Sequence, residues 1–329
     1  MYPQITVAFQ TDKSLSAYGS LAKKAEDDGF DGVSVYNDML YQPAWLPLLE
    51  IAQKTKQIKL GPAAINPFTS HPINIAGNIA IIDAVSNGRA YCGFARGAWL
   101  DFVGLKPQKP IASLSEAMAC VRHLLRQDKN PFEGKYFPLQ GGDALRWSIL
   151  RPDIPFMLGS WGKKTIAACL PMISEIKLGG TANPSAIDAM KSFLNQRKAT
   201  VNIACGAVTV VDNDGRLALN RARREVALYL PVVAELDTTV TIEPDRLAGI
   251  RESVKEYDFG KAEAYISDDI IRKFALAGTP DEVTQQVLSI FEAGAGRLEF
   301  GTPHGLNPEK GLTLLGEIVL PNLHSALKR

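Results

Sequence analysis

Short apolar runs alternate along the chain with longer stretches of helical periodicity. The runs are continuously apolar rather than alternating, which is typical of strands in a parallel sheet that is covered on both faces. They occupy residues 5–9, 33–36, 58–60, 89–94, 155–158, 173–178, 202–211 and 297–300. Eight strands that alternate with helices predict an α/β fold, a single TIM-type (β/α)8 barrel domain over residues 1–329.

The same pattern predicts helices at residues 15–28, 43–54, 73–85, 111–126, 216–236 and 279–293. Ser113 or Ser115 is expected to cap the start of the fourth of these, and residues 279–282 to cap the last. Residues 130–149 are rich in Pro, Gly and aromatic side chains and predict an excursion with a small hairpin, while residues 237–267 are polar and weakly periodic. The barrel is therefore expected to carry insertions after strands four and seven.

Charge and composition favour a protein that handles small molecules. The chain has 36 basic and 35 acidic side chains, so no electrostatic bias toward nucleic acid or a membrane surface exists. No apolar run is long enough to span a bilayer, and the N-terminus does not resemble a secretory signal. These features predict a cytoplasmic protein.

The cysteines and histidines do not predict a metal site. Cys92, Cys120, Cys169 and Cys205 lie far apart in apolar segments, as reduced core thiols do, and no CxxC spacing occurs. HxH and HExxH patterns and carboxylate clusters are missing as well, so we expect no metal.

Polar residues gather just after the predicted strands, where parallel α/β proteins bind ligands. Asn37 and Asp38 follow strand two, residues 66–72 follow strand three, and Arg96 follows strand four. Arg96 is expected to meet an acidic group of a substrate or cofactor, or else to form a salt bridge at the barrel rim. His71 and His304 follow strands three and eight, where a histidine is either structural or a proton carrier.

A glycine-rich turn follows strand five and opens a helix with two lysines. Its residues are Gly159, Ser160, Trp161, Gly162, Lys163, Lys164 and Thr165. The spacing does not fit a P-loop, but backbone N–H groups at a helix start suit a phosphate; the alternative is an ordinary turn with surface lysines. Gly179, Gly180 and Thr181 after strand six are expected to add amides to the same anion site. No GxSxG elbow or GxGxxG fingerprint is present.

Three segments stand out: residues 61–72 read GPAAINPFTSHP, residues 80–89 AIIDAVSNGR and residues 93–105 GFARGAWLDFVGL. They resemble the bacterial luciferase-like superfamily, and within it most closely the branch that depends on the deazaflavin coenzyme F-420, which includes methylenetetrahydromethanopterin reductases. Residues 29–31, 277–280 and 300–305 resemble the same family in the same order. The resemblance covers nearly the whole chain.

The resemblance implies a barrel that holds a flavin-type ring at the carboxyl ends of its strands. It implies a non-prolyl cis peptide after strand three, which here would be Ala63-Ala64, flanked by Ile65 and by Asn66 as a partner for the polar edge of the ring. The family's phosphate site corresponds to residues 159–163. Relatives of this kind commonly form dimers through helices on one side of the barrel, so the resemblance implies a homodimer.

Two departures from the family pattern bear on the reaction. Many relatives have Asp-His after strand two, where this chain has Asn37-Asp38. The tetrahydromethanopterin reductases have an acidic residue inside strand one, where this chain has only apolar residues, so the same pterin reaction is not expected.

These observations predict an oxidoreductase that uses a deazaflavin or flavin cofactor to transfer hydride to or from a small organic substrate. Asp38 or His304 is expected to give or take the proton. The alternatives are an FMN-dependent monooxygenase of the same superfamily and a non-catalytic flavin-binding protein. The sequence does not name the substrate.

Overall fold

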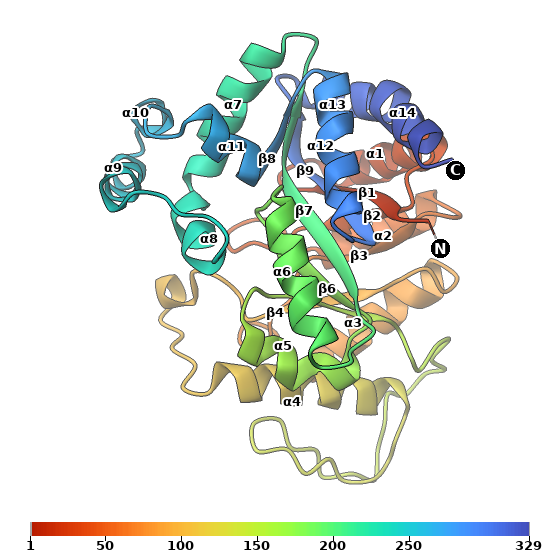
Figure 1. Ribbon diagram of the computed structural model, residues 1–329. Helices are drawn as coiled ribbons and strands as arrows, with labels where there is room; N and C mark the ends of the chain where they lie inside the picture. The colour runs from red at the N-terminus through yellow and green to blue at the C-terminus, as the bar shows by residue number, and fades with distance from the viewer. Residues whose placement is uncertain (1, 329) are drawn as a thin grey trace. The chain divides into compact units, whose positions relative to one another are not determined.

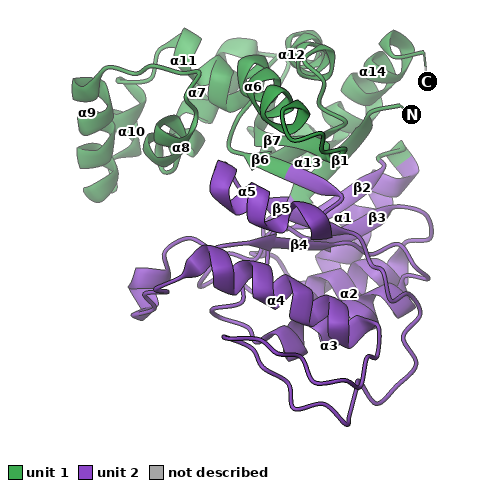
Figure 2. Ribbon diagram, turned by 60° about the horizontal axis from the view of Figure 1, so that its bottom comes forward, with its two compact units in different colours: residues 1–8, 28–30, 177–329 green, residues 9–27, 31–176 purple. Residues whose placement is uncertain are grey.

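The computed structural model describes residues 2–328 and divides the chain into two compact units, shown in green and purple in Figure 2. Unit 1 consists of residues 1–8, 28–30 and 177–329, and unit 2 of residues 9–27 and 31–176. The single-domain interpretation of residues 1–329 stays a prediction.

Unit 2 contains parallel strands with helices between them. Its strands are β2 (Gly32–Val35), β3 (Lys59–Pro62), β4 (Cys92–Ala95) and β5 (Phe156–Gly159). Its helices are most of α1 (Leu15–Asp28), α2 (Trp45–Lys54), α3 (Pro72–Val85), η1 (Leu100–Val103), α4 (Pro110–Leu125), α5 (Lys163–Cys169) and η2 (Leu170–Met172). β2 pairs with β3, and β4 with β5, in parallel register. The strands are almost entirely buried, as their continuously apolar sequence predicts.

Unit 1 contains most of β1 (Gln4–Phe9) and β6 (Glu175–Gly179), together with β7 (Asn202–Val211), β8 (Ala275–Gly278) and β9 (Arg297–Gly305). Its helices are α6 (Pro184–Asn195), α7 (Gly215–Ala227), α8 (Leu230–Leu236), α9 (Pro244–Lys255), α10 (Phe259–Glu263), α11 (Asp268–Phe274), α12 (Pro280–Glu292), α13 (Pro308–Leu314), η3 (Leu315–Val319) and α14 (Leu320–Ala326). β9 pairs in parallel with β1 and β7, and β8 pairs with the end of β7. In Figure 1, α8 to α11 gather into one group beside α7.

All eight predicted strands are present, and both insertions are confirmed. The excursion after strand four contains the expected small hairpin, because Phe132 and Leu139 form an antiparallel bridge with two backbone hydrogen bonds of 3.0 Å. The Thr279–Glu282 capping box at the start of α12 is also confirmed.

Four local predictions were wrong. The pattern missed β8, whose four residues are too short to show a period. The helix expected over residues 216–236 is broken into α7 and α8, since Pro231 lacks the N–H that a continuous helix needs there. Residues 237–267, expected to be irregular, contain α9 and α10. The N-cap of α4 is Lys109, and Ser113 instead lies inside the helix and donates to the Lys109 carbonyl.

The four cysteines are buried, and none forms a disulfide bond with another cysteine of the described chain. Burial raises the pKa of Cys205 to about 12 and that of Cys120 and of Cys169 to about 11. These thiols are therefore protonated near neutral pH, as expected for core residues.

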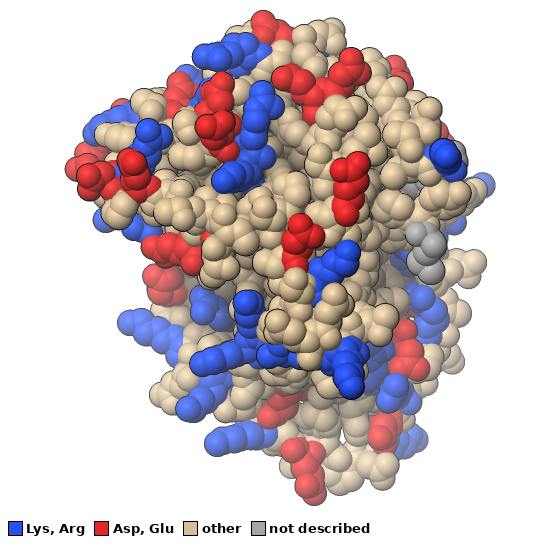
Figure 3. All heavy atoms as spheres, in the orientation of Figure 1, with Lys and Arg blue, Asp and Glu red and all other residues tan. Residues whose placement is uncertain are grey.

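Acidic and basic side chains both occur across the face shown in Figure 3. Within residues 2–328, no helix combines the length and the apolar character needed to cross a membrane.

A buried ion cluster lies inside unit 1. Glu299 of β9 is fully buried and accepts hydrogen bonds from Lys177 of β6 and from Arg297, the latter at 3.1 Å. Arg297 also donates to the Thr6 hydroxyl of β1 at 3.1 Å. Gly206 of β7 lies beside this cluster, where a Cβ atom would come 2.9 Å from the Lys177 side chain. One carboxylate therefore compensates two buried cations and links β9 to β6, and Arg297 extends the cluster to β1.

We expect Glu299→Gln to lower the free energy of unfolding by about 3–5 kcal/mol, because it leaves two buried cations without their carboxylate. Lys177→Met should cost less, since Glu299 keeps Arg297 as its partner. Urea denaturation of both variants at neutral pH tests this order. A larger loss for Lys177→Met would contradict the assignment of Glu299 as the centre of the cluster.

Candidate active site

The carboxyl ends of the strands in unit 2 bring several predicted site residues to one edge. Val35 of β2 lies opposite Pro62 of β3, and the Ala63 N–H donates to the Val35 carbonyl at 2.8 Å. Ala95 of β4 lies opposite Gly159 of β5. Asp38, the segment from Ala63 to Asn66, Arg96 and the turn after Gly159 therefore all follow strand ends of the same unit.

The segment after β3 is fixed by a close approach to β4. The Ile65 N–H donates to the Gly93 carbonyl at 2.8 Å, and the Ile65 carbonyl accepts from the Ala95 N–H at 2.9 Å. A Cβ atom on Gly93 would overlap the Pro62 carbonyl, and one on Gly61 the Tyr91 carbonyl, so both positions require glycine. The Ala63–Ala64 peptide is cis, which confirms the expectation drawn from the family resemblance. Ala63 and Ala64 are half-buried and present only methyl groups.

Asn66 is buried, and its side-chain oxygen organises the loop after β3. The oxygen accepts the Phe68 N–H at 3.0 Å, the Thr69 N–H at 2.9 Å and the Thr69 hydroxyl at 3.1 Å. Gly97 lies next to the Asn66 amide and has φ of +86°, a conformation that favours glycine. The loop thus uses the oxygen of Asn66 and leaves its amide NH2 for a ligand.

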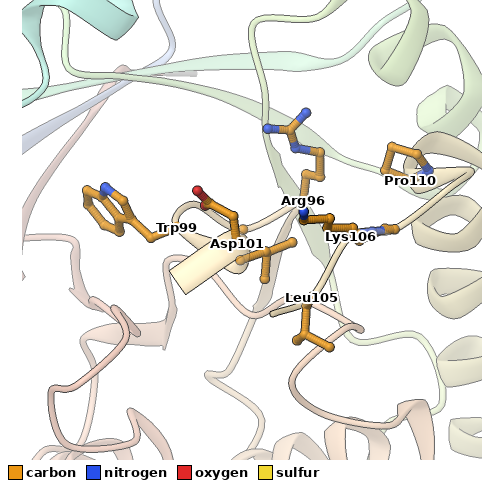
Figure 4. Close-up of a pocket in the computed structure, with 9 residues that line it drawn as sticks. Arg96, Trp99, Asp101, Leu105, Lys106 and Pro110 are labelled. Atoms are coloured by element: carbon orange, nitrogen blue, oxygen red, sulfur yellow. The ribbon is translucent and has the colours of Figure 1, made fainter. Parts of the chain in front are cut away.

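Arg96 lines a pocket of about 260 Å³ at the end of β4. Trp99, Asp101 and Lys106 line the same pocket, and Figure 4 shows Arg96 between Trp99 on one side and Pro110 on the other. Arg96 is exposed and forms no ion pair with any residue of the described chain, so the predicted salt bridge at the rim is not found. Its guanidinium remains available to an anion.

The two candidate proton carriers differ in their surroundings. Asp38 is half-buried in unit 2 and accepts a hydrogen bond of 2.8 Å from the Gln10 side chain. His304 is at the end of β9 in unit 1, is only 4% exposed and has φ of +76°, which is rare for a histidine. His71 has a structural role: its Nδ1 accepts the Ile73 N–H and caps α3.

The turn after β5 opens a helix as predicted, with Gly162 at the N-cap and Lys163 as the first residue of α5. The Gly162 N–H donates to the Ser160 hydroxyl at 3.1 Å. Gly162, Lys163 and Lys164 are exposed, and α5 has no acidic residue in its first turn. The turn therefore keeps the positive character that the phosphate hypothesis needs.

The amides after β6 are used within unit 1. The N–H groups of Gly180 and Thr181 both donate to the Gly206 carbonyl, at 2.7 and 3.3 Å. A Cβ atom on Gly180 would come 2.9 Å from Val233 of α8. Gly180 therefore serves close packing, and these two amides do not add free donors to the anion site that was expected there.

Sequence reasoning missed Gln10, Trp99 and Lys106 as residues of this region. Gln10 directly follows β1, and the rule that polar residues after parallel strands face ligands would have found it. Trp99 and Lys106 follow β4 in an irregular stretch without a period to place them. No group of three or more metal-ligating side chains occurs within residues 2–328.

A protein whose parallel strands alternate with helices, and whose polar residues lie at the carboxyl ends of those strands, has the plan of the TIM-barrel enzymes. The chain belongs to the luciferase-like monooxygenase family, which it matches over residues 3–297. It is thus an enzyme of the luciferase-like class.

Two curated relatives match over nearly their full length. The chain is 28% identical to the 5,10-methylenetetrahydromethanopterin reductase of Methanopyrus kandleri, over 92% of this chain and 93% of the relative. It is 25% identical to the F420-dependent glucose-6-phosphate dehydrogenase of Amycolatopsis mediterranei, over 92% of this chain and 93% of the relative.

The fold also matches a solved structure. The coenzyme F420 dependent tetrahydromethanopterin reductase from Methanopyrus kandleri superposes with a TM-score of 0.88 and 25% identity, over 98% of this chain and 100% of that chain. The fold class is therefore the TIM-type barrel of the luciferase-like enzymes, as the strand pattern predicted.

We expect Asn66→Ala to lower the free energy of unfolding by about 1–3 kcal/mol, because the loop loses the acceptor of three donors, two of them backbone N–H groups. Asn66→Asp keeps that oxygen and should stay close to the unchanged protein. The free energies of unfolding of both variants, measured by chemical denaturation, show whether the side-chain oxygen or the NH2 group of Asn66 holds the loop. Equal losses in both variants would show that the oxygen does not hold the loop.

Proposed function

We propose that this protein is an oxidoreductase that transfers a hydride between the deazaflavin coenzyme F420 and a small organic substrate. The names of its relatives support the cofactor, since the curated matches include an F420-dependent dehydrogenase and the matched solved structure is an F420-dependent reductase. The observation that carries the proposal is the segment from Ala63 to Asn66, which offers a flat ligand half-exposed backbone with methyl side chains and a buried amide beside it.

The residues of this edge fit a flavin-type ring. Ala63 and Ala64 would let the backbone approach the face of a ring, because they carry only methyl groups and the Ile65 side chain is buried. Asn66 would donate its NH2 group to a carbonyl of the ring edge, since its oxygen is already used by the loop. When bound, a deazaflavin supplies a carbon that gives or takes hydride; the protein orients it and keeps water away.

The anionic part of the cofactor would lie on the turn after β5, where Gly162, Lys163 and Lys164 are exposed. The proposed contacts of this turn are Gly159, Ser160, Trp161, Gly162 and Lys163. Gly179 and Gly180 after β6 remain contacts predicted from the sequence; within unit 1 the Gly180 N–H bonds Gly206, and its missing side chain leaves room for Val233. Arg96 offers its guanidinium to an acidic group of the cofactor or of the substrate.

Asp38 is the preferred proton carrier of the proposal. It is half-buried, follows β2 at the same edge as the Ala63–Asn66 segment, and is held by a neutral amide. His304 remains the second candidate, and its 4% exposure favours a structural role at the end of β9. The cytoplasmic location stays a prediction.

A second candidate function is an FMN-dependent monooxygenase. The family description favours it, because the matching family is one of luciferase-like monooxygenases. The same ring site would serve, but the bound flavin would have to react with oxygen. The identity of the tightly bound cofactor separates the two candidates.

We expect the purified protein to bind coenzyme F420 at least tenfold more tightly than FMN, a difference of about 1.4 kcal/mol or more. Calorimetric titration at low salt with each cofactor tests this, and Asn66→Asp should weaken F420 binding while leaving the fold intact. Preference for FMN would favour the monooxygenase. Binding of neither would overturn both candidates.

We also propose that the chain forms a homodimer through α3. This helix is rich in apolar residues and exposes Ile73, Ile81 and Val85 by 40–46%. With Gly77 these residues follow one another at four-residue spacing and form a single stripe, and Trp147 lies next to Gly77. A stripe of exposed apolar side chains suits packing against a second copy.

We expect a mass in solution of about twice the 35.7 kDa of one chain. Ile81→Glu should reduce it to that of one chain, because it places a charge in the centre of the stripe. Leu217→Glu on α7, a position that is similarly exposed, is the matched control and should not change the mass. Light scattering after gel filtration measures all three. A monomeric parent protein would refute the interface.

A further inference from the structure

Gln10 is fixed in one orientation against Asp38. Its Nε2 lies 2.8 Å from Asp38 Oδ2, and its Oε1 accepts the Thr11 N–H at 2.8 Å. A carboxylate only accepts hydrogen bonds, and the Thr11 N–H only donates. The two partners therefore determine which end of the Gln10 amide faces Asp38.

The backbone around Gln10 is anchored to the core of unit 2. The Gln10 carbonyl accepts from Lys13 Nζ at 3.3 Å and from the Tyr18 hydroxyl at 3.4 Å, and Tyr18 of α1 is fully buried. The Tyr18 hydroxyl in turn accepts the Lys13 N–H at 2.9 Å. The hydroxyl of a buried tyrosine of α1 therefore anchors the backbone of the loop after β1.

The same loop is tied to the loop that carries Asp38. The Gln42 N–H donates to the Thr11 carbonyl at 3.1 Å, and the Gln42 side chain donates to the Lys13 carbonyl. Residues 10–13 and 37–42 therefore form one hydrogen-bonded patch after β1 and β2. Within that patch, the Gln10 amide is the side chain that donates a hydrogen bond to the Asp38 carboxylate.

We infer that Gln10 is the positioning residue of Asp38 and holds its carboxylate toward the substrate. The inference rests on the proposed function, in which Asp38 gives its proton to the substrate heteroatom and is reprotonated by water, or works in the reverse direction. A neutral amide holds the carboxylate without placing a charge beside it.

The variants are Gln10→Leu, Asp38→Ala and their combination, with Gln42→Leu as the matched control. Gln42 belongs to the same patch and bonds Lys13, but within the described residues it forms no hydrogen bond with Asp38. In the free protein, Gln10→Leu should lower the urea midpoint when Asp38 is present and have a clearly smaller effect when Asp38 is already alanine. Equal effects in both backgrounds would overturn the inference.

The second measurement is turnover of F420-loaded protein with acetone, a carbonyl probe, and reduced cofactor. Gln10→Leu should lower kcat about tenfold to a hundredfold with the KM for cofactor unchanged, and Gln42→Leu should change neither. In the Asp38→Ala background, Gln10→Leu should have no further effect. A loss that is independent of Asp38, or one confined to KM, would overturn the inference. If the parent protein does not turn over the probe, that result counts against the proposed function, and the urea cycle still decides whether Gln10 holds Asp38.

Discussion

The close pairing of Ile65 with β4 is the constraint on which the candidate site depends. Its two backbone hydrogen bonds, to Gly93 and from Ala95, form only because Gly61 and Gly93 have no side chains. This pairing carries the backbone past the end of β3, and it places Asn66 beside Gly97. The half-exposed alanines and the buried amide are thus positioned by the sheet rather than by a flexible loop, which is what a rigid ring requires of its site.

Charge is distributed differently in the interior and at the strand ends. Inside unit 1, Glu299 is surrounded by Lys177, Arg297 and the Thr6 hydroxyl, and this cluster connects strands without facing solvent. At the strand ends of unit 2, Asp38 is held by a neutral amide, and Arg96 has no ionic partner among the described residues. Charges that are compensated serve the fold, and those without an ionic partner are the ones a ligand can use.

The fold could be predicted from the sequence because each parallel strand is buried on both faces and reads as a continuous apolar run. The same apolar runs located the ends of the strands, and the rule that ligands bind after parallel strands singled out Asp38, Asn66 and Arg96. The rule fails where an element is too short for a period, as for β8, or where a proline divides a helical pattern, as at Pro231. The sequence pattern also could not predict that the Gly180 and Thr181 amides donate to the Gly206 carbonyl, because a hydrogen bond between segments far apart in the sequence leaves no local signal.

The carboxyl end of strand one presents an amide rather than a carboxylate to Asp38. Val7, Ala8 and Phe9 are apolar, and the first polar side chain after them is Gln10, which bonds Asp38. An acid inside the strand would bring a second negative charge toward the carboxylate, and like charges at one site oppose each other's ionisation. A single carboxylate supported by an amide avoids that conflict. A carboxylate that faces an amide can gain or lose its charge without repulsion from a neighbouring acid, which is the property that a proton carrier at this strand end would need.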